Sequence, residues 1–210
     1  NMVTKSIERA QAQVESLNFE IRKNVLKFDQ VLNQQREVIY KWRRNLLTSD
    51  DISDLLQDWF QDIKESVSQN IEQHKKTYES LEQFESLVDD ELSELLSEHK
   101  KKELLVNIKI DDTLNIDENL ETLFMKNEQK DSINFWNLAR AAALSFIDQT
   151  WKNHLSEMDY LRSGIGLRAM GQRDPLVEYQ KEGYDLFEEL IFNVKSSVVR
   201  LLLNFDGVEV

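Results

Sequence analysis

The sequence predicts an all-α protein, and three observations support that prediction. The chain has only five glycines and one proline among 210 residues, so it has few of the turn formers that an all-β fold needs. Apolar side chains recur every three or four residues over long stretches, which is the period of an amphipathic helix. With 40% hydrophobic residues, the chain can bury a sizeable core. We expect a long spine helix, an inserted acidic helical lobe and an antiparallel pair of helices.

The first segment, residues 1–50, predicts one amphipathic helix from about residue 3 to about residue 47. Only Gln35 interrupts its apolar stripe, and Thr48 or Ser49 is expected to cap the helix that follows. A helix of about 65 Å needs other helices to lie against, in this chain or in a longer protein. The stripe consists of Ile7, Ala10, Val14, Leu17, Ile21, Val25, Phe28, Leu32, Ile39, Trp42 and Leu46.

The middle segment, residues 51–130, predicts an insertion made of shorter helices. One helix is expected over residues 51–71 and another over residues 78–105, with an extended or loop piece at 106–119. This segment holds 21 of the 39 acidic residues and only 9 of the 26 basic ones. Such a charge repels phosphates, which argues against nucleic-acid binding through this lobe. The simpler interpretation is an acidic face that keeps an exposed lobe in solution.

The last segment, residues 131–210, predicts an antiparallel helical hairpin. The helical period runs from about Asp131 to near Arg168, and a second helix starts with Asp174 as its N-cap and Pro175 at its first position. Three of the five glycines and the only proline lie around this reversal. The apolar positions of the two arms are Trp136, Ala139, Ala143, Ile147, Trp151, Leu155, Met158, Leu161 and Ile165, then Tyr179, Leu186, Phe187, Leu190, Val194, Val198, Leu201 and Leu202.

Few residues offer chemistry. The chain has no cysteine, which excludes disulfides and thiolate zinc sites within it, and it has no glycine-rich phosphate-binding motif. His154 and Glu157 have a spacing that could share a metal, but no second pair completes a site, so we expect His154 at the core or its boundary and Trp151 in packing. The chain begins inside a helical pattern without a start signal, which is typical of a piece of a longer protein.

Two stretches resemble one known family. The stretch "NFEIRKNVLKFDQVLNQQREVIYKWRRNLL", residues 18–47, resembles the start of the helical scaffold domain of SecA, the bacterial preprotein translocase ATPase. The stretch "TWKNHLSEMDYLRSGIGLRAMGQRDPLVEYQKEGYDLF", residues 150–187, resembles that family's two-helix finger. Two separate blocks in the right order make the resemblance specific. It covers nearly the whole chain if residues 51–130 are the helical wing domain.

The resemblance implies a part of a translocase. In the family, the scaffold helix braces the ATP-driven motor and the preprotein-binding domain. Arg22, Lys23, Asp29, Gln35 and Arg36 would then contact that motor, and the alternative for each is a solvated or intrahelical role. The implied partners are the SecYEG channel, the preprotein polypeptide and the rest of the same protein. ATP and Mg²⁺ belong to the full-length protein, for which a homodimer is one option, at the inner face of the cell membrane.

The finger tip is the second implied site. In the family the finger enters the channel opening, touches the moving polypeptide and restrains ATPase activity. The corresponding residues here are Arg168, Ala169, Met170, Gly171, Gln172 and Arg173. The family often has Gly-Tyr-Ala where this chain has Ala169, Met170 and Gly171. An aromatic-specific mechanism is therefore in doubt, whereas an apolar contact is retained, and the alternative is that Met170 folds back as a hairpin cap.

The 210 residues of this chain lack the nucleotide-binding motor and the cysteine-rich zinc tail of the family. We therefore expect no ATP binding or hydrolysis by this chain alone, no metal site in it, and a mainly mechanical and regulatory role. The second hypothesis, from another class, is a stand-alone helical adaptor that holds partners along its spine. The first predicts motor motifs upstream in the same reading frame, and the second predicts a start codon near Met2.

Overall fold

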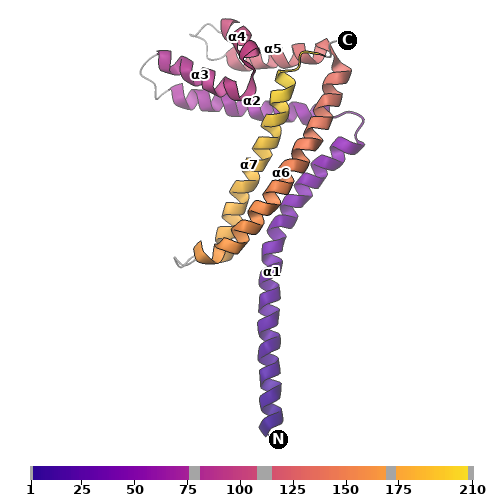
Figure 1. The fold of residues 1–210 in the computed structure, drawn as a ribbon, viewed down its shortest axis with the longest axis vertical. Helices are drawn as coiled ribbons and strands as arrows, with labels where there is room; N and C mark the ends of the chain where they lie inside the picture. The colour runs from indigo at the N-terminus through magenta and orange to yellow at the C-terminus, as the bar shows by residue number, and fades with distance from the viewer. Residues whose placement is uncertain (1, 76–80, 108–114, 169–173, 208–210) are drawn as a thin grey trace. The chain divides into compact units, whose positions relative to one another are not determined.

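The computed structural model describes residues 2–75, 81–107, 115–168 and 174–207. In these ranges the chain forms seven α-helices and no β-strand, which confirms the all-α prediction. Figure 1 shows the order of these helices along the chain. The helices are α1 (Met2–Thr48), α2 (Ser53–Lys75), α3 (Leu81–Leu95), α4 (Glu98–Asn107), α5 (Asn115–Lys130), α6 (Ser132–Arg168) and α7 (Pro175–Leu203).

The chain divides into two compact units. The first unit comprises Asn1–Trp42 and Lys152–Glu188, and the second comprises Arg43–Trp151 and Glu189–Val210. The three long helices α1, α6 and α7 therefore each contribute a segment to both units. The division into a scaffold segment at 1–50, a wing at 51–130 and a scaffold continuation at 131–210 remains a prediction.

The first unit is built on the apolar faces of three helices. The second half of α6 and the first half of α7 lie side by side along α1 (Figure 1). Their shared core consists of Met158, Leu161, Ile165 and Tyr179, against which four half-buried residues pack. Those four are Phe28, Val31, Leu32 and Leu186. These positions follow the three-to-four residue spacing, which is why each helix turns one apolar face to the other two.

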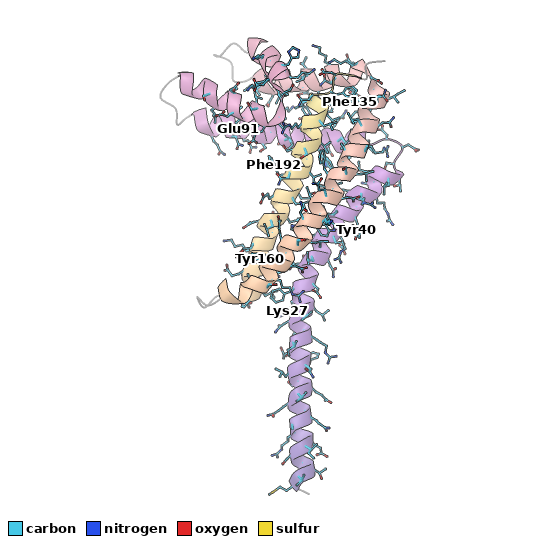
Figure 2. All side chains as sticks on the ribbon, viewed as in Figure 1. Lys27, Tyr40, Glu91, Phe135, Tyr160 and Phe192 are labelled. Carbon is cyan, nitrogen blue, oxygen red and sulfur yellow. The ribbon has the colours of Figure 1, made fainter. Side chains whose placement is uncertain are left out.

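The N-terminal part of α1 has a different environment. Every described side chain from Met2 to Lys27 is exposed, and Figure 2 shows these side chains standing around the helix. Leu17 and Phe19 are exposed to 61% and 60%. Helical geometry places Phe19 nearly opposite the stripe that contains Leu17. The predicted apolar stripe therefore runs along one face of α1, but in the first unit α6 and α7 cover it only from Phe28 onward.

The second unit packs around aromatic rings. The rings of Phe60 in α2 and Phe124 in α5 stack with centroids 4.4 Å apart. Phe135 at the start of α6 meets Phe124 edge-on at 5.5 Å and Phe205 at 5.4 Å. Such offset and edge-to-face contacts are the favoured geometries of aromatic pairs. They join α2, α5, α6 and the segment after α7 into one core.

Two capping predictions have opposite outcomes. The Asp174 carboxylate accepts a hydrogen bond from the backbone N–H of Leu176 at 2.8 Å, which confirms it as the cap of α7. The prediction that Thr48 or Ser49 caps α2 is wrong. Thr48 still belongs to α1, where its hydroxyl donates to the carbonyl of Arg44, and the Asp51 carboxylate instead accepts from the N–H of Ser53. That hydrogen bond lowers the pKa of Asp51 below its usual value.

Two predictions for the middle segment also need correction. The single helix expected over residues 78–105 is two helices, because α3 ends at Leu95 and α4 starts at Glu98. The extended or loop piece expected at 106–119 is helical at both ends, because α4 ends at Asn107 and α5 starts at Asn115. Residues 108–114 lie outside the described residues. The helix predicted at 51–71 is present as α2, which continues to Lys75.

The corner between α1 and α2 is held by α6. The guanidinium of Arg140 donates hydrogen bonds to the carbonyl oxygens of Leu46, Ser49 and Asp50. The last carbonyls of a helix have no partner within the helix, so a cation that donates to them caps the end of α1. All four residues lie in the second unit.

No described helix is both long and apolar enough to span a membrane.

Candidate functional site

The one residue that interrupts the apolar stripe of α1 is the centre of a buried polar contact. The side chain of Gln35 is only 6% exposed. Its Nε2 donates to the carbonyl oxygen of Gly183 in α7 at 2.8 Å, and its Oε1 lies 2.9 Å from Nε2 of His154 in α6. We call these three residues the Gln35 junction. One amide thus links α1 to both helices of the hairpin.

The junction fixes the protonation state of His154. Because Gln35 must present its NH₂ group to the Gly183 carbonyl, its Oε1 faces His154 and accepts a hydrogen bond. Nε2 of the imidazole therefore carries the proton. His154 is 1% exposed, and this burial lowers its pKa from 6.5 to about 4, so the ring is neutral at physiological pH. The prediction that His154 lies in the core is confirmed.

Gly183 of α7 lies close to side chains of both α6 and α1. A Cβ at this position would lie 2.7 Å from Cε of Met158 in α6 and 3.8 Å from Cγ1 of Val31 in α1. The first distance is well inside van der Waals contact, so a larger residue would force the end of the Met158 side chain to move. The missing side chain also leaves the Gly183 carbonyl within reach of Gln35.

A second contact joins α1 to α6 nearer the C-terminal end of α6. Nη1 of Arg162 donates to Oδ1 of Asp29 at 3.0 Å, and both side chains are partly exposed. The same guanidinium lies over the ring of Phe28, 5.7 Å from its centroid. Phe28 in turn meets Tyr179 of α7 edge-on at 4.9 Å. The exposure of this ion pair limits its contribution to stability to about 1 kcal/mol or less.

The structure separates the five predicted motor-contact residues into two groups. Asp29 and Gln35 have partners within the chain, as described above. Arg22, Lys23 and Arg36 do not bind the hairpin in any contact of the described residues: Arg22 donates to the carbonyl of Asn18, and Arg36 donates to the side chain of Asn33. Arg22 and Lys23 lie in the exposed part of α1.

The predicted tip residues fall mostly outside the described residues. Arg168 is the last residue of α6, and the structure does not describe its side chain. Ala169, Met170, Gly171, Gln172 and Arg173 lie in the undescribed range 169–173. What the structure describes is the two helix ends that flank them, α6 ending at Arg168 and α7 starting at Pro175.

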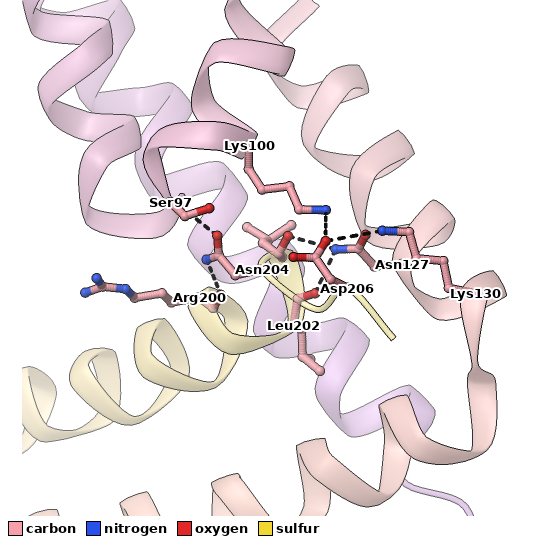
Figure 3. A network of polar contacts seen from close by, with 9 residues as sticks. Ser97, Lys100, Asn127, Lys130, Arg200, Leu202, Asn204 and Asp206 are labelled. Atoms are coloured by element: carbon pink, nitrogen blue, oxygen red, sulfur yellow. Dashed lines mark hydrogen bonds and ion pairs between the residues drawn. The ribbon is translucent and has the colours of Figure 1, made fainter. Parts of the chain in front are cut away.

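A polar network surrounds the C-terminal end of α7 in the second unit (Figure 3). Nδ2 of Asn127, a fully buried residue of α5, donates to the carbonyls of Leu202 and Leu203 at 3.0 and 2.7 Å. Asn204 accepts from the N–H of Ser97 at 2.7 Å and donates to the carbonyl of Leu95 at 2.8 Å. The two asparagines therefore satisfy the carbonyls at the end of one helix and the break between α3 and α4.

Charged groups complete this network. Nζ of Lys100 lies 2.7 Å from the Asp206 carboxylate, and Nζ of Lys130 lies 3.4 Å from it. The hydrogen bond from Lys100 lowers the pKa of Asp206, whereas burial and the neighbouring Lys100 lower the pKa of Lys130. This network anchors the segment after α7 to α4 and α5.

The described residues offer no metal centre. In the ranges that the structure covers, no group of three or more histidine or acidic side chains is placed to hold a metal ion. His154 faces Gln35, while Glu157 is exposed, so these two do not form the shared site that their spacing allowed. The contacts described above are hydrogen bonds, ion pairs and side-chain packing between helices.

Sequence reasoning missed several of these contacts. It gave Gln35 as a break in the stripe and, through the family resemblance, as a motor contact, and did not pair it with His154 or Gly183. A polar residue at a stripe position and a glycine within a long helical pattern were the available signals. The Asp29–Arg162 pair and the asparagine caps join residues that are 133 and about 75 to 110 positions apart in the chain, and no local pattern marks them.

Comparison with known proteins gives consistent matches. The family model described as the SecA wing and scaffold domain matches residues 1–206. The protein translocase subunit SecA of Tropheryma whipplei strain Twist is 38% identical over 98% of this chain and 25% of its own length. SecA 1 of Mycobacterium ulcerans and SecA of Streptomyces coelicolor are also 38% identical, over 97% and 98% of this chain and 23% and 22% of their own lengths. The chain thus spans about a quarter of these relatives.

Proposed function

Because this chain belongs to the SecA wing and scaffold domain family, we propose that it is the scaffold, wing and two-helix finger part of a SecA-type protein translocase. In this proposal α1 is the scaffold helix, residues 51–130 form the wing, and α6 with α7 forms the finger. The observation that carries the proposal is the family match over residues 1–206, which includes every one of these elements.

The contacts of the first unit support a mechanical role for the finger. The apolar core around Met158, the Gln35 junction and the Asp29–Arg162 pair join the finger to α1 at three places. A displacement of α1 would therefore be transmitted to the α6–α7 hairpin rather than absorbed between the helices, because packed interfaces resist continuous deformation.

The exposed part of α1 supports a contact with the motor of the longer protein. Ile7, Val14, Leu17 and Ile21 lie on one face, and each is more than half exposed. An uncovered apolar stripe of this length is typical of a docking surface. Arg22, Lys23 and Arg36 are proposed to contribute to that contact. In the longer protein, the motor domains would bind ATP and Mg²⁺.

The finger tip is proposed to touch the preprotein and the SecYEG channel, at the inner face of the cell membrane. The residues concerned are Arg168, Ala169, Met170, Gly171, Gln172 and Arg173. Methionine is flexible and polarizable, so Met170 suits contact with polypeptides of varied sequence. Arg168 and Arg173 on either side would keep the tip hydrated between such contacts.

Site-specific crosslinking tests this role. Because the chain has no cysteine, a Met170→Cys probe is unique within these 210 residues. In the full-length protein, with any cysteine elsewhere replaced, the probe should crosslink to a stalled preprotein and to the channel during ATP-driven transport. Tyr184→Cys is the matched control, because Tyr184 is 60% exposed but lies on the same hairpin well inside α7. Equal crosslinking from both positions, or none from the tip, would contradict the proposal.

We also propose that the finger restrains the ATPase activity of the motor. Added to a SecA motor that lacks this region, the chain should lower basal ATP turnover in a saturable way. The same chain carrying Gln34→Met, a change at an exposed position of α1, should act equally well. Unchanged turnover at saturating chain would remove the regulatory part of the proposal and leave the mechanical part intact.

A further inference from the structure

We propose that Gln35 is a positioning residue whose amide, bonded to His154 and Gly183, sets the axial register of the α6–α7 hairpin on α1. Its importance for transport rests on the function proposed above, whereas the register itself can be measured without any transport assay. The three residues come from three helices of the first unit and are all buried.

The apolar contacts of this unit do not define a single register. Phe28, Val31 and Leu32 of α1 pack against Met158, Leu161, Ile165 and Tyr179 of the hairpin. Such side chains recur every three or four residues, so a slide of one turn would bring new apolar residues opposite one another. Long apolar interfaces between helices commonly need a buried polar residue to select one alignment.

The Gln35 junction supplies that selection. The residues one turn before and after Gln35 are Val31 and Ile39, neither of which can accept from Nε2–H of His154 or donate to the Gly183 carbonyl. A slide of α1 by one turn would therefore leave a buried imidazole N–H without its partner. The amide of Gln35 would face apolar surface at the same time. Only the observed alignment satisfies both groups.

Gly183 adds a steric condition. Val31 of α1 lies in ordinary van der Waals contact, 3.8 Å from the place of a missing Cβ at Gly183, while Met158 of the same hairpin lies 2.7 Å from it. The residues one turn along α7 in each direction are Tyr179 and Phe187. Neither leaves its backbone carbonyl as open as glycine does, so the amide of Gln35 finds this acceptor at one position of α7.

Moving the amide by one turn along α1 tests the proposal. In Val31→Gln/Gln35→Met, the amide sits four residues nearer the N-terminus of α1. The hairpin should follow it by about 6 Å, at 1.5 Å per residue. The chain has no cysteine, so spin labels can be placed at Glu15→Cys and Lys181→Cys, both exposed. Pulsed dipolar spectroscopy then measures the distance between α1 and α7 in the full-length protein, with any cysteine elsewhere replaced.

The expected result is a single distance peak that is about 6 Å shorter than in the parent protein, because the hairpin moves toward Glu15. Gln34→Met is the matched control at an exposed neighbour, and it should keep the parent distance. The parent distance in Val31→Gln/Gln35→Met, with helix content unchanged by circular dichroism, would overturn the proposal.

A second variant decides the question if the first loses helix content. Gln35→Met/His154→Leu removes both polar side chains together, so neither leaves an unpaired group buried. Its distance distribution should broaden or split by about one turn, roughly 5.4 Å, and an unchanged single peak would overturn the proposal. A failure of the proposed function would look different: transport would not respond to changes at Met170, while these distances would still shift.

Discussion

Gly183→Ala should destabilise the protein even though alanine is the better helix former. The new methyl group would lie 2.7 Å from Cε and 3.2 Å from Sδ of Met158, which is fully buried and cannot swing into solvent. Overpacking of this kind costs about 1–3 kcal/mol, whereas replacing a helical glycine by alanine gains about 1 kcal/mol. The net expectation is a loss of about 1 kcal/mol in the free energy of unfolding.

The sign should reverse when the obstructing side chain is removed. Met158→Ala alone opens a cavity and should cost about 2–5 kcal/mol. In that background the methyl group at position 183 enters empty space, so Gly183→Ala should stabilise by about 1 kcal/mol. The two changes should therefore show a coupling energy of about 2 kcal/mol, within the range found for residues in contact.

Urea unfolding followed by far-UV circular dichroism measures these differences. Gly164→Ala is the matched control, because nothing lies within 4 Å of a Cβ at that position of α6, and it should stabilise the protein by up to about 1 kcal/mol. If Gly183→Ala stabilised the protein as Gly164→Ala does, or if its effect added to that of Met158→Ala, the tight packing of the Met158 side chain against Gly183 would be refuted.

Three further predictions concern single groups. The pKa of His154 is lowered from 6.5 to about 4 in the folded chain. As the pH falls, the unfolded chain therefore binds a proton on this ring near pH 6.5, whereas the folded chain binds it only near pH 4. Stability should therefore fall by about 2–3 kcal/mol between pH 7 and pH 4.5, at 1.36 kcal/mol per pKa unit, and Gln35→Met/His154→Leu should lack this component of the decline in urea titrations. Arg140→Ala removes the donors to the end of α1 and should lower stability by about 1–3 kcal/mol in thermal unfolding, whereas Arg44→Ala at an exposed position should change it by less than about 0.5 kcal/mol. Asp174→Ala removes the cap of α7 and should cost about 1 kcal/mol in the same assay, while an unchanged melting temperature would show that Pro175 alone starts the helix.

The long helices could be predicted from the sequence because their signals are local. The three-to-four residue period runs through most of α1, α6 and α7, with one break at Gln35, and it gives their bounds to within a few residues. Asp174 followed by Pro175 marks the start of α7 for a reason that needs no tertiary contact, since the cap and the fixed φ act within one turn.

The break between α3 and α4 could not be predicted in this way. Asn204, more than 100 positions away, bonds both the carbonyl of Leu95 and the N–H of Ser97. The helical pattern of the middle segment continues through this point, so only the fold reveals the partner that ends one helix and starts the next. The cap of α2 was wrong for a smaller reason, because α1 extends one residue further and Asp51 offers a carboxylate at the right distance.

For the candidate site, the sequence did not reveal the partners that two of the predicted residues have within the chain. Asp29 and Gln35 were predicted to contact a motor outside the chain, which stays a prediction, and both also have partners on α6 or α7. These partners lie 133 and 148 positions away, and a single helix pattern cannot show which face meets which neighbour. The role of the tip residues stays a prediction that rests on the family resemblance.

The proposed action of the hairpin tip on the preprotein is best tested by Met170→Asp in the full-length protein. An acidic side chain should abolish the apolar contact, so ATP-driven preprotein transport should fall by about tenfold or more, as a loss of roughly 1.4 kcal/mol implies. Urea unfolding should stay within about 0.5 kcal/mol of the parent protein, as for surface changes in general. Tyr184→Asp, an exposed aromatic position on the same hairpin, should leave transport near the parent rate. Normal transport by a stably folded Met170→Asp protein would contradict that proposal.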